Sequence, residues 1–508
     1  MSVYDPTSLD QEDESPPRPG RRAMVRFLLG GAVILVATAA VVSTAILLQI
    51  KTAVDTFNTA SKGNHIPNIA RFLQGVPAGG PQTILVLGSD RRFSDIKAHN
   101  PVRSDTIILM RLDPSKGATG IMSIPRDLKV KIPYKKGLVT DKINAAYALG
   151  GPALAVKTVH LILHIPINHV VNVNFGGFRR AVNRLGCVYA DVDRRYYNDN
   201  NPPAGGGPDY ATIHVNAGYQ KLCGQNALDY VRYRHFDTDL VRAARQQDFL
   251  RQAKEQFGVG RLFTDRNELL RIFGRYTQTD IHSTSAILSL LKLAFESSKH
   301  PIQEVHFRST EGQSYVTATA AQIRKTVSEF LNAKASSGAR AKAKPRPSDK
   351  HRHHQRSSAN FPGLFAAAKA ASDQAIRVGT RVGFPVYYPT LAAVASTYVT
   401  EKDTPRAYTI ADRGHHRYRA YRLVVRAPGL GQYYGIEGTS WTAPPILDNP
   451  STTIKMRGRK YGLFYDGSRL RLVAFRTPHA VYWVSNTLLE TIKNKQMLGI
   501  ARSLTRVG

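Results

Sequence analysis

Carboxylate side chains stand directly beside apolar segments in the first quarter of this 508-residue chain. Asp90 follows the segment TILVLGS, and Asp105 opens the segment DTIILMRLD. If the two segments are antiparallel strands, both carboxylates lie at the same edge of a sheet. Two hard oxygen ligands close together suit Mg²⁺, or Mn²⁺, shared with the phosphates of a substrate. Taken alone, such acids are more often turn or capping residues.

Arginines surround the same strand ends and recur further along the chain. Arg232 and Arg234 in DYVRYRH are two apart, which in an extended segment places both on one face. Arg242 and Arg245 are three apart on an expected helix and share a face, with Gln246 beside them. Each alone is typical of a solvated surface charge, but together they indicate an anion site, because guanidinium groups bind phosphate bidentately. The arginines beside the strand ends are Arg91, Arg103 and Arg126.

The elements that position these residues alternate between strand and helix patterns. We expect an α/β fold, in which helices flank a mixed central sheet. A Gly-Gly-Pro sequence is expected to divide the helical segment 141–164 into two helices. The expected strands are 83–90, 104–113, 120–133, 169–175 and 187–192, and the further helices are 177–186 and 239–257.

The N-terminal region predicts a membrane anchor. Residues 27–50 carry no charge across 24 positions, enough helix to cross the hydrocarbon core. Four arginines precede this segment, so we expect residues 1–26 to be a cytoplasmic tail and the rest to lie outside the cell membrane. A cleaved signal peptide is the alternative. A stem, 51–80, is expected to follow the anchor.

The composition changes again after residue 332. Residues 333–360 are basic and lack apolar periodicity, so we expect a disordered linker between a domain at 81–332 and a separate domain at 361–508. The second domain is expected to be α+β, because Asp466-Gly467 predicts a hairpin and the last residues predict a strand followed by an amphipathic helix.

The net charge limits the classes of binding partner but does not identify one of them. Lys and Arg number 70 against 37 Asp and Glu, a formal charge of +33, which favours nucleic acid, anionic lipid or phosphate-bearing substrates. An extracytoplasmic domain argues against chromosomal DNA. The chain has no P-loop, GxSxG or HExxH motif, so nucleotide-driven, serine-esterase and zincin chemistries lack their usual signals.

A series of motifs resembles the LytR-CpsA-Psr family, membrane-anchored enzymes that attach glycopolymers to bacterial cell walls. The resemblance covers about 81–260 closely and 260–330 weakly, through LVLGSDRR, RSDTIILMRLD, MSIPRDLKVKIP, DKINAAYALGG, ALDYVRYRH and DTDLVRAARQQDFL. By this resemblance Asp90 and Asp105 hold the metal. The residues that it assigns to the pyrophosphate of a polyprenyl-linked donor are Arg103, Arg126, Arg232, Arg234, Arg242 and Arg245, supported by Gln246. Arg91 is assigned there less firmly, and Asp127 is expected to orient Arg126.

The resemblance implies a phosphotransferase. A peptidoglycan hydroxyl attacks the sugar-side phosphorus of a polyprenyl-pyrophosphate glycopolymer and releases polyprenyl phosphate, with pyrophosphate hydrolysis as a possible side activity. The family places the lipid in an apolar tunnel, for which the segment 153–163 is a candidate lining; ordinary core is the alternative. Two other functions stay open: a wall-polymer-binding scaffold, and a membrane-tethered transcriptional regulator.

The two cysteines depart from the family pattern. Cys187 and Cys223 occupy positions where relatives carry small or polar residues. Such paired changes in an extracytoplasmic domain favour one disulfide over two free thiols. The region 361–508 lies outside the family resemblance, and its role is not indicated by the sequence.

Overall fold

A computed structural model of the chain describes residues 51–333 and 361–507 with some gaps. The predicted tail, membrane helix and linker therefore lie largely or wholly outside the described residues. The backbone but not the side chain is described at Asp105, Pro114, Asp239 and Arg266. The gaps are 53–54, 63, 65, 67, 76–79, 90–103, 200–211, 234–236, 258–265, 282–285, 287–289, 291–292, 294–295, 298–299, 301, 313 and 402.

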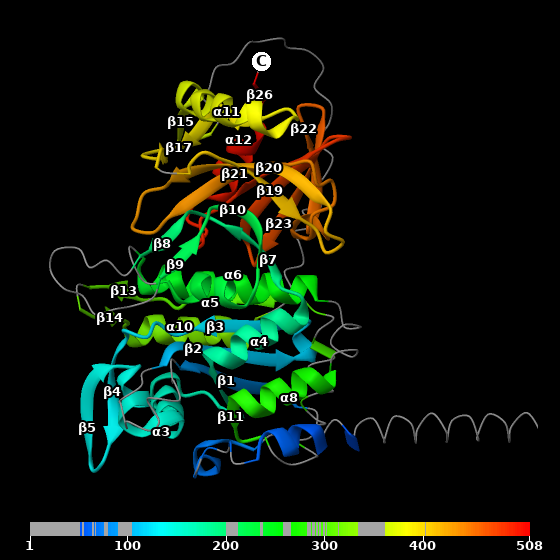
Figure 1. Cartoon of the computed structure of the whole chain (residues 1–508). Helices are drawn as coiled ribbons and strands as arrows, with labels where there is room; N and C mark the ends of the chain where they lie inside the picture. The colour runs from blue at the N-terminus through cyan, green and yellow to red at the C-terminus, as the bar shows by residue number, and fades with distance from the viewer. Residues whose placement is uncertain are drawn as a thin grey trace, which may run out of the picture. The chain divides into compact units, whose positions relative to one another are not determined.

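A mixed six-stranded sheet forms the centre of the first domain, as predicted (Figure 1). Its order is β11-β6-β1-β2-β3-β12, with β1 parallel to β6, β12 parallel to β3 and the other pairs antiparallel. The strands are β1 (Gln82–Ser89), β2 (Ser104–Asp113), β3 (Ala118–Ser123), β6 (His169–Asn174), β11 (Thr277–Thr279) and β12 (Ile302–Val305). The helices are α3 (Ala145–Leu163), α4 (Phe175–Leu185), α5 (Gly224–Arg232), α6 (Asp239–Gln256), α8 (Arg266–Tyr276) and α10 (Ala320–Leu331).

Smaller antiparallel pairs surround this sheet. One predicted strand, 120–133, is two strands, because Pro125 cannot donate to a ladder and the chain turns there. The second half pairs with the next strand as a hairpin. These pairs are β4 (Lys129–Tyr134) with β5 (Gly137–Lys142), β7 (Val188–Val192) with β10 (Gly218–Leu222), β8 (Tyr196–Asn198) with β9 (Ile213–Val215), and β13 (Thr310–Glu311) with β14 (Val316–Thr317).

The central sheet has two different faces. Side chains alternate along a strand, so Leu85 and Leu87 of β1 enter the main core with α3, whereas Ile84 and Val86 face the other side. On β2 the same alternation puts Leu109 in the core and Met110 on the opposite face. The opposite face is the one that borders the cavities described below.

Helix α3 is the only described helix that is long and apolar enough to cross a membrane. Its backbone is non-helical at Gly150 and Gly151, directly before Pro152, which confirms the predicted break. Val156 and Val159 of the second half lie fully buried in the main core. Part of the apolar surface of α3 is therefore buried inside the domain.

The C-terminal domain is α+β, as predicted. Its largest sheet is antiparallel, in the order β18-β20-β21-β25-β24-β23-β22 with β19 beside β20, and Asp466-Gly467 turns between β23 and β24. The main elements are α11 (Ala368–Val382), β18 (Thr397–Tyr398), β19 (Arg406–Ala411), β20 (Arg417–Arg426), β21 (Tyr433–Thr439), β22 (Thr452–Met456), β23 (Arg459–Asp466), β24 (Arg469–Arg476), β25 (Val481–Ser485) and α12 (Asn494–Arg502). Short strands complete it: β15 (Leu364–Ala366) with β17 (Leu391–Ala393), and β16 (Tyr387–Pro389) with β26 (Leu504–Arg506).

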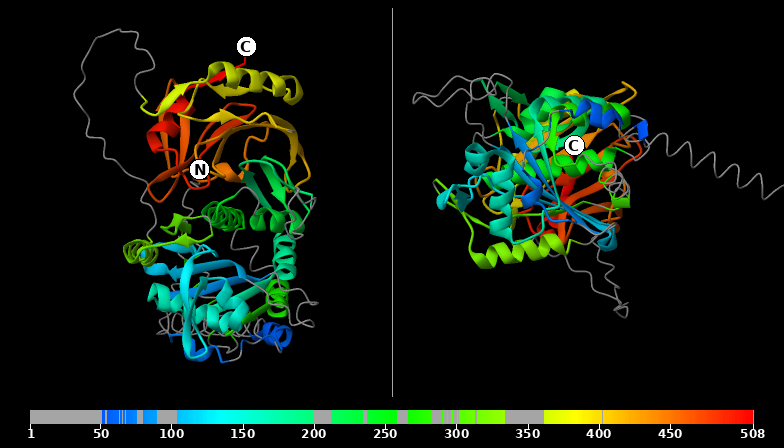
Figure 2. Two further views of the ribbon diagram at one scale, coloured as in Figure 1. Left: turned by 90° about the vertical axis from the view of Figure 1, so that its left-hand side faces the viewer. Right: turned by 90° about the horizontal axis from the view of Figure 1, so that it is seen from below.

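The expectation that this domain is separate is wrong. One face of its sheet packs on its own helices, through Leu423 among others. The other face packs on β7 and β10 of the first domain, where Tyr189 and Tyr219 share an apolar cluster with Trp441 and Trp483. In Figures 1 and 2, β7 and β10 lie between α6 and this sheet. The sequence cannot show this packing between domains. A buried sheet face has the same apolar pattern whether it packs on its own domain or on another.

Candidate functional site

A cavity of about 220 Å³ opens where β1 ends and β2 begins. Its walls come from the strand ends, from the start of α4, from the end of α5 and from α6. Gly88 lets Thr106 come close, since a Cβ at Gly88 would lie 2.8 Å from the Thr106 Cβ. The lining includes Gly88, Thr106, Asn174, Phe175, Phe178, Leu228, Val231, Arg232, Arg242, Gln246 and Phe249.

Three predicted site residues meet at this cavity: Arg232, Arg242 and Gln246. Arg242 is only 6% exposed and stands in the first turns of α6. Gln246, one turn later, donates from Nε2 to Thr106 Oγ1 at 3.0 Å and to the Val231 carbonyl at 3.1 Å. The glutamine therefore joins α6 to β2 and α5 at the cavity wall, which is consistent with a supporting role.

Arg232 is held by a carboxylate of its own helix. Its Nε and Nη2 donate to Asp229 Oδ1 at 3.1 and 2.9 Å, and its Cζ lies 5.6 Å from the centre of the Phe175 ring. Burial raises the pKa of Asp229, and the charge of Arg232 opposes that rise. Because Arg232 ends α5, the prediction that it lies in an extended segment is wrong.

Arg245 lies elsewhere. Its guanidinium is fully buried, pairs with Asp237 and donates from Nη2 to the Tyr233 carbonyl at 2.7 Å. Its Cζ lies 4.7 Å from the centre of the Tyr196 ring. Arg245 does not line the cavity, so this geometry gives no support to the predicted contact with pyrophosphate. Arg245 links Asp237 to the Tyr233 carbonyl instead.

The prediction of a metal site depends on how β1 and β2 pair. β1 and β2 are antiparallel, as that prediction required, and Ser89 pairs with Ser104 while Gly88 pairs with Thr106. Asp105 is thus the extra residue of a β-bulge, a feature that often re-aims a strand beside an active site. Asp90, Arg91, Arg103, Arg234 and the Asp105 side chain lie outside the described residues, so their predicted roles stay predictions.

Arg126 and Asp127 follow β3 and do not line the cavity. Arg126 Nε lies 3.5 Å from Asp127 Oδ2, a contact compatible with the predicted orienting role. Asp127 is closer to Lys142, whose Nζ lies 3.0 Å from Asp127 Oδ1. Lys142 is a partner that the sequence analysis did not identify.

A larger apolar cavity of about 570 Å³ adjoins the first. The two share three lining residues, Val86, Val173 and Leu250. Its other walls are mostly hydrophobic side chains of the open sheet face and of α8. The segment 153–163 lines neither of these two cavities, and its Val156 and Val159 lie in the main core, in agreement with the alternative of ordinary core.

Several aromatic residues at the cavity were missed by the sequence analysis. Phe175 and Phe178 lie on α4, whose N-terminus opens at the cavity, and Phe249 lies on α6. A helix N-terminus carries partial positive charge, so α4 adds to the attraction for an anion. Phe178 follows Asn174 by four residues, and Phe249 follows Gln246 by three. Residues at these spacings share a helix face, so the sequence could have indicated both phenylalanines.

The structure pairs Cys187 and Cys223 in a disulfide, as predicted. Cys187 follows Gly186, the C-cap of α4, and Cys223 is the N-cap residue of α5. The bond therefore ties together two helices that both supply cavity wall.

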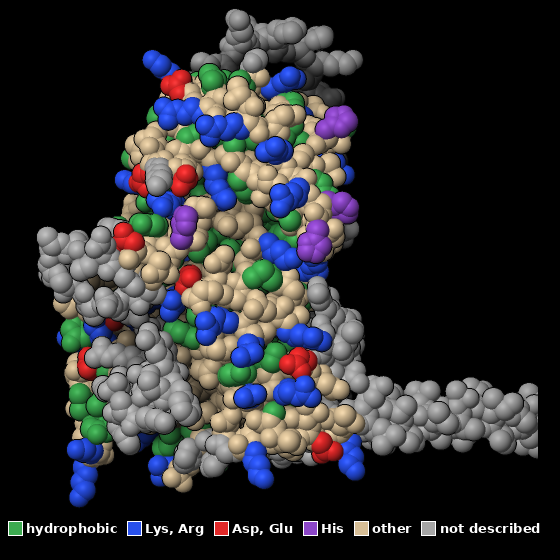
Figure 3. Space-filling view, viewed as in Figure 1, with side chains coloured by type: hydrophobic (Ala, Val, Ile, Leu, Met, Phe, Trp, Pro, Cys, Tyr) green, Lys and Arg blue, Asp and Glu red, His purple; other side chains and the backbone are tan. Residues whose placement is uncertain are grey.

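The described side chains do not test the predicted metal site. Among them no group of three His, Cys, Asp or Glu could hold a metal ion. The predicted ligands Asp90 and Asp105 are not part of that set. On the face drawn in Figure 3, basic side chains are spread over both domains, so charge alone does not locate a site.

Comparison with known proteins identifies relatives of the first domain. The family model LytR_cpsA_psr matches residues 44–335. An uncharacterized protein of Staphylococcus aureus is 34% identical over 277 residues, which span 53% of this chain and 64% of that protein. The polyisoprenyl-teichoic acid–peptidoglycan teichoic acid transferase TagT of Bacillus subtilis is 35% identical over 202 residues, 38% of this chain and 60% of that one. This chain therefore spans less than two thirds of either relative.

Two further matches cover more of the related chain. The transferase TagU of Oceanobacillus iheyensis, named in the same words, is 29% identical over 317 residues, 60% of this chain and 92% of that one. A solved structure described as TagT bound to LIIa-WTA is 25% identical and covers 51% of this chain and 93% of that one, with a TM-score of 0.39.

Proposed function

The chain belongs to the LytR_cpsA_psr family, and on that premise we propose that it is a membrane-anchored phosphotransferase of the cell wall. It transfers a glycopolymer phosphate from a polyprenyl-pyrophosphate carrier to a hydroxyl of peptidoglycan. The names of the relatives TagT and TagU support this reaction class. The polymer need not be a teichoic acid.

The observation that carries the proposal is the pair of adjoining cavities. The smaller one offers Arg232 and Arg242 to an anion, and the larger one offers about 570 Å³ lined almost entirely by apolar side chains. A polyprenyl pyrophosphate has this division, with a charged head on a hydrocarbon chain. Apolar burial of the chain and charge-assisted hydrogen bonds to the head together favour such a donor.

The proposed reaction is an in-line substitution at phosphorus. The acceptor oxygen bonds to the sugar-side phosphorus, the bond from that phosphorus to the bridging oxygen breaks, and polyprenyl phosphate leaves with the bonding electrons. The acceptor proton passes to a base, for which an aspartate at the strand ends is our candidate. Arg232 and Arg242 neutralise charge on the pyrophosphate, and positioning supplies much of the rate. With water as acceptor, the same step is pyrophosphate hydrolysis.

Asp90 and Asp105 are proposed to hold Mg²⁺ or Mn²⁺, which would neutralise further phosphate charge. The anchor at 27–50 would place both cavities outside the cell membrane, close to lipid and wall. That location argues against chromosomal DNA as a partner for the basic surface. A wall-polymer scaffold is the remaining alternative.

The test uses the full chain in detergent, a polyprenyl-pyrophosphate-linked saccharide and isolated peptidoglycan. We expect saccharide to become attached to peptidoglycan, and we expect Asp105→Asn to abolish attachment while binding of the donor persists. Asp113→Asn, at the other end of β2, is the matched control and should retain activity. Binding of polymer without any attachment by the unaltered protein would favour the scaffold. Full activity with a chelator present would refute the proposed role of the metal ion.

A further inference from the structure

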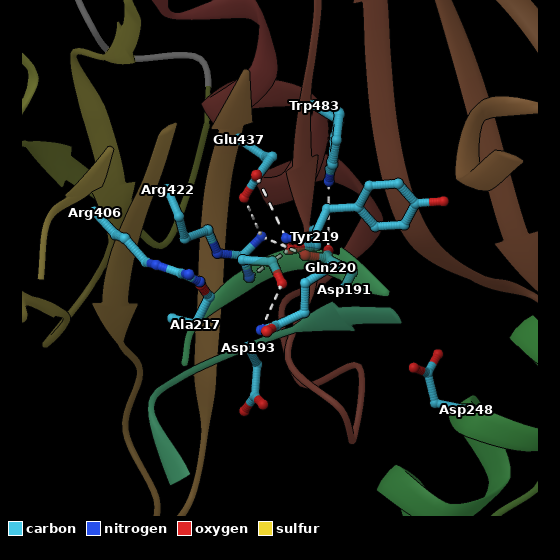
Figure 4. A network of polar contacts seen from close by, with 12 residues as sticks. Asp191, Asp193, Ala217, Tyr219, Gln220, Asp248, Arg406, Arg422, Glu437 and Trp483 are labelled. Atoms are coloured by element: carbon cyan, nitrogen blue, oxygen red, sulfur yellow. Dashed lines mark hydrogen bonds and ion pairs between the residues drawn. The ribbon is translucent and has the colours of Figure 1, made fainter. Parts of the chain in front are cut away.

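A buried arginine of the C-terminal domain reaches a strand of the first domain (Figure 4). Arg422 on β20 is fully buried, and its Nη1 lies 2.6 Å from Asp191 Oδ1 on β7 and 3.4 Å from Glu437 Oε2 on β21. Trp483 on β25 donates from Nε1 to the other Asp191 oxygen at 3.4 Å. Asp191 is therefore held by two side chains of the C-terminal domain.

Glycines on both sides allow this close contact. A Cβ at Gly435 on β21 would lie 2.1 Å from the Arg422 Cζ, and a Cβ at Gly218 on β10 would lie 2.4 Å from the Tyr408 hydroxyl. Gly218 also has φ +107°, which L side chains rarely adopt. Both surfaces thus lack the side chains that would prevent this contact.

The strand held by Arg422 in turn holds α6. The Asp191 N–H donates to Gln252 Oε1 at 3.2 Å, and the Tyr189 N–H donates to Gln256 Oε1 at 2.8 Å. Gln256 Nε2 returns a hydrogen bond to the Tyr189 carbonyl at 2.6 Å. Helix α6 also carries Arg242 and Gln246, which line the cavity. Strand β7 therefore contacts the same helix that forms part of the cavity wall.

A second connection runs from the first residue of β21, Tyr433. The Tyr433 ring centre lies 5.1 Å from the Arg194 Cζ, and Arg194 Nη2 lies 2.6 Å from Asp237 Oδ1. Asp237 also pairs with Arg245, which binds the Tyr233 carbonyl. Tyr433 of the C-terminal domain therefore contacts Arg194, and Arg194 belongs to the ion-pair network that holds Asp237 and, through Arg245, Tyr233.

We propose that the C-terminal domain is a positioning element of the transfer site, in which Arg422 and Tyr433 hold residues 188–194 and thereby fix α6, Tyr233 and Asp237. This inference rests on the proposed transfer reaction only for its kinetic consequence. A mutation far from the reacting atoms that misplaces them by about 1 Å can lower a rate on the order of 100-fold. We therefore expect the loss of Arg422 to lower turnover, although Arg422 itself does not contact the substrate.

The test measures hydrogen exchange and transfer kinetics on the full chain in detergent. Arg422→Met should raise exchange in peptides from 188–194 and 239–257 and lower kcat at least about tenfold, with a smaller change in donor KM. Arg422→Lys should recover part of kcat, because a lysine keeps one ion pair but not the planar contacts to several partners. Arg419→Met, exposed on the same strand, is the control and should change neither quantity.

Two further variants keep the inference testable if Arg422→Met does not fold. Asp191→Asn keeps the shape of the side chain and should raise exchange in α6. Tyr433→Leu should raise exchange mainly in peptides that contain 233–237. A lower melting temperature with unchanged α6 exchange and unchanged kcat would overturn the inference. If the unaltered protein shows no transfer, the proposed function fails, while the exchange data still decide the positioning role.

Discussion

The cavity and the domain interface both place arginines against aromatic rings, but they differ in their acids. At the interface Arg422 meets two buried carboxylates within the protein. At the cavity the described lining residues include Arg232 and Arg242 and no Asp or Glu. The interface arginine is thus paired with carboxyl groups of two other strands, whereas Arg232 at the cavity wall is paired with Asp229 of its own helix. Composition alone does not distinguish the two cases.

The largest expected effect concerns a second buried arginine near the interface. Arg251 on α6 is 3% exposed, and its Nε lies 2.8 Å from Glu304 Oε1 on β12. Arg251→Met leaves Glu304 buried without its charge partner, so we expect a loss of about 3–5 kcal/mol in the free energy of unfolding. Urea unfolding of the full chain measures it. Arg271→Met removes an exposed ion pair with Glu268 and should cost about 0–1 kcal/mol; equal losses would contradict the distinction.

Removal of the disulfide should loosen the cavity and leave the interface intact. The bond closes a sequence separation of 36 residues, so replacing Cys187 and Cys223 together with serine should cost about 3–4 kcal/mol. Hydrogen exchange should rise in α4 and α5, since those helices are tied by the bond. An unchanged unfolding midpoint, or faster exchange confined to the C-terminal sheet, would show that the bond does not support the cavity.

Arg242→Met tests the cavity directly. A charge-assisted hydrogen bond contributes about 1.5–3 kcal/mol, so we expect donor affinity to fall about 10- to 150-fold. The urea midpoint should change little, and Arg242→Lys should recover part of the affinity. Titration with a polyprenyl pyrophosphate measures the effect. Unchanged affinity with a large loss of stability would place Arg242 with the interface arginines.

We also expect a pH dependence of the interface. Burial raises the pKa of Glu437 to about 8, although the charge of Arg422 and a hydrogen bond from Tyr408 oppose the rise. The folded protein therefore binds this proton more tightly than the unfolded chain does, so the stabilisation present below about pH 4.5 is lost as the pH rises through 8. The melting temperature should fall between pH 6 and pH 8.5.

Two substitutions isolate the contribution of Glu437. Glu437→Gln cannot ionise, so its melting temperature should fall less steeply over the same pH range. Glu401→Gln removes an exposed acid that pairs with Arg426 and should leave the slope unchanged. A slope in Glu437→Gln equal to that of the unaltered protein would assign the pH dependence to other groups, among which the pKa of Asp466 is also raised to about 8 by burial.

The sequence determined the local structure and the family. Alternation and turn residues predicted β1, β2 and β6 closely, since a strand buried on both faces reads as a short apolar run between polar turns. Gly150 and Gly151 predicted the break in α3, because a glycine pair before proline interrupts the helix. The antiparallel pairing of β1 and β2 was only a condition of the predicted metal site, and the structure supplied it. The motifs were enough to identify the family, because each motif is defined by particular residues at particular positions.

Only the tertiary structure decided which residues meet at a site. Arg242 and Arg245 lie on α6 about 60° apart, yet one lines a cavity and the other is enclosed by Asp237 and tyrosines. The apolar segment 153–163 proved to be core, while the open space lies across the sheet. Residues 361–508 proved to be docked on β7 and β10. In each case the sequence shows which face is apolar or charged, but segments far along the chain determine what covers that face.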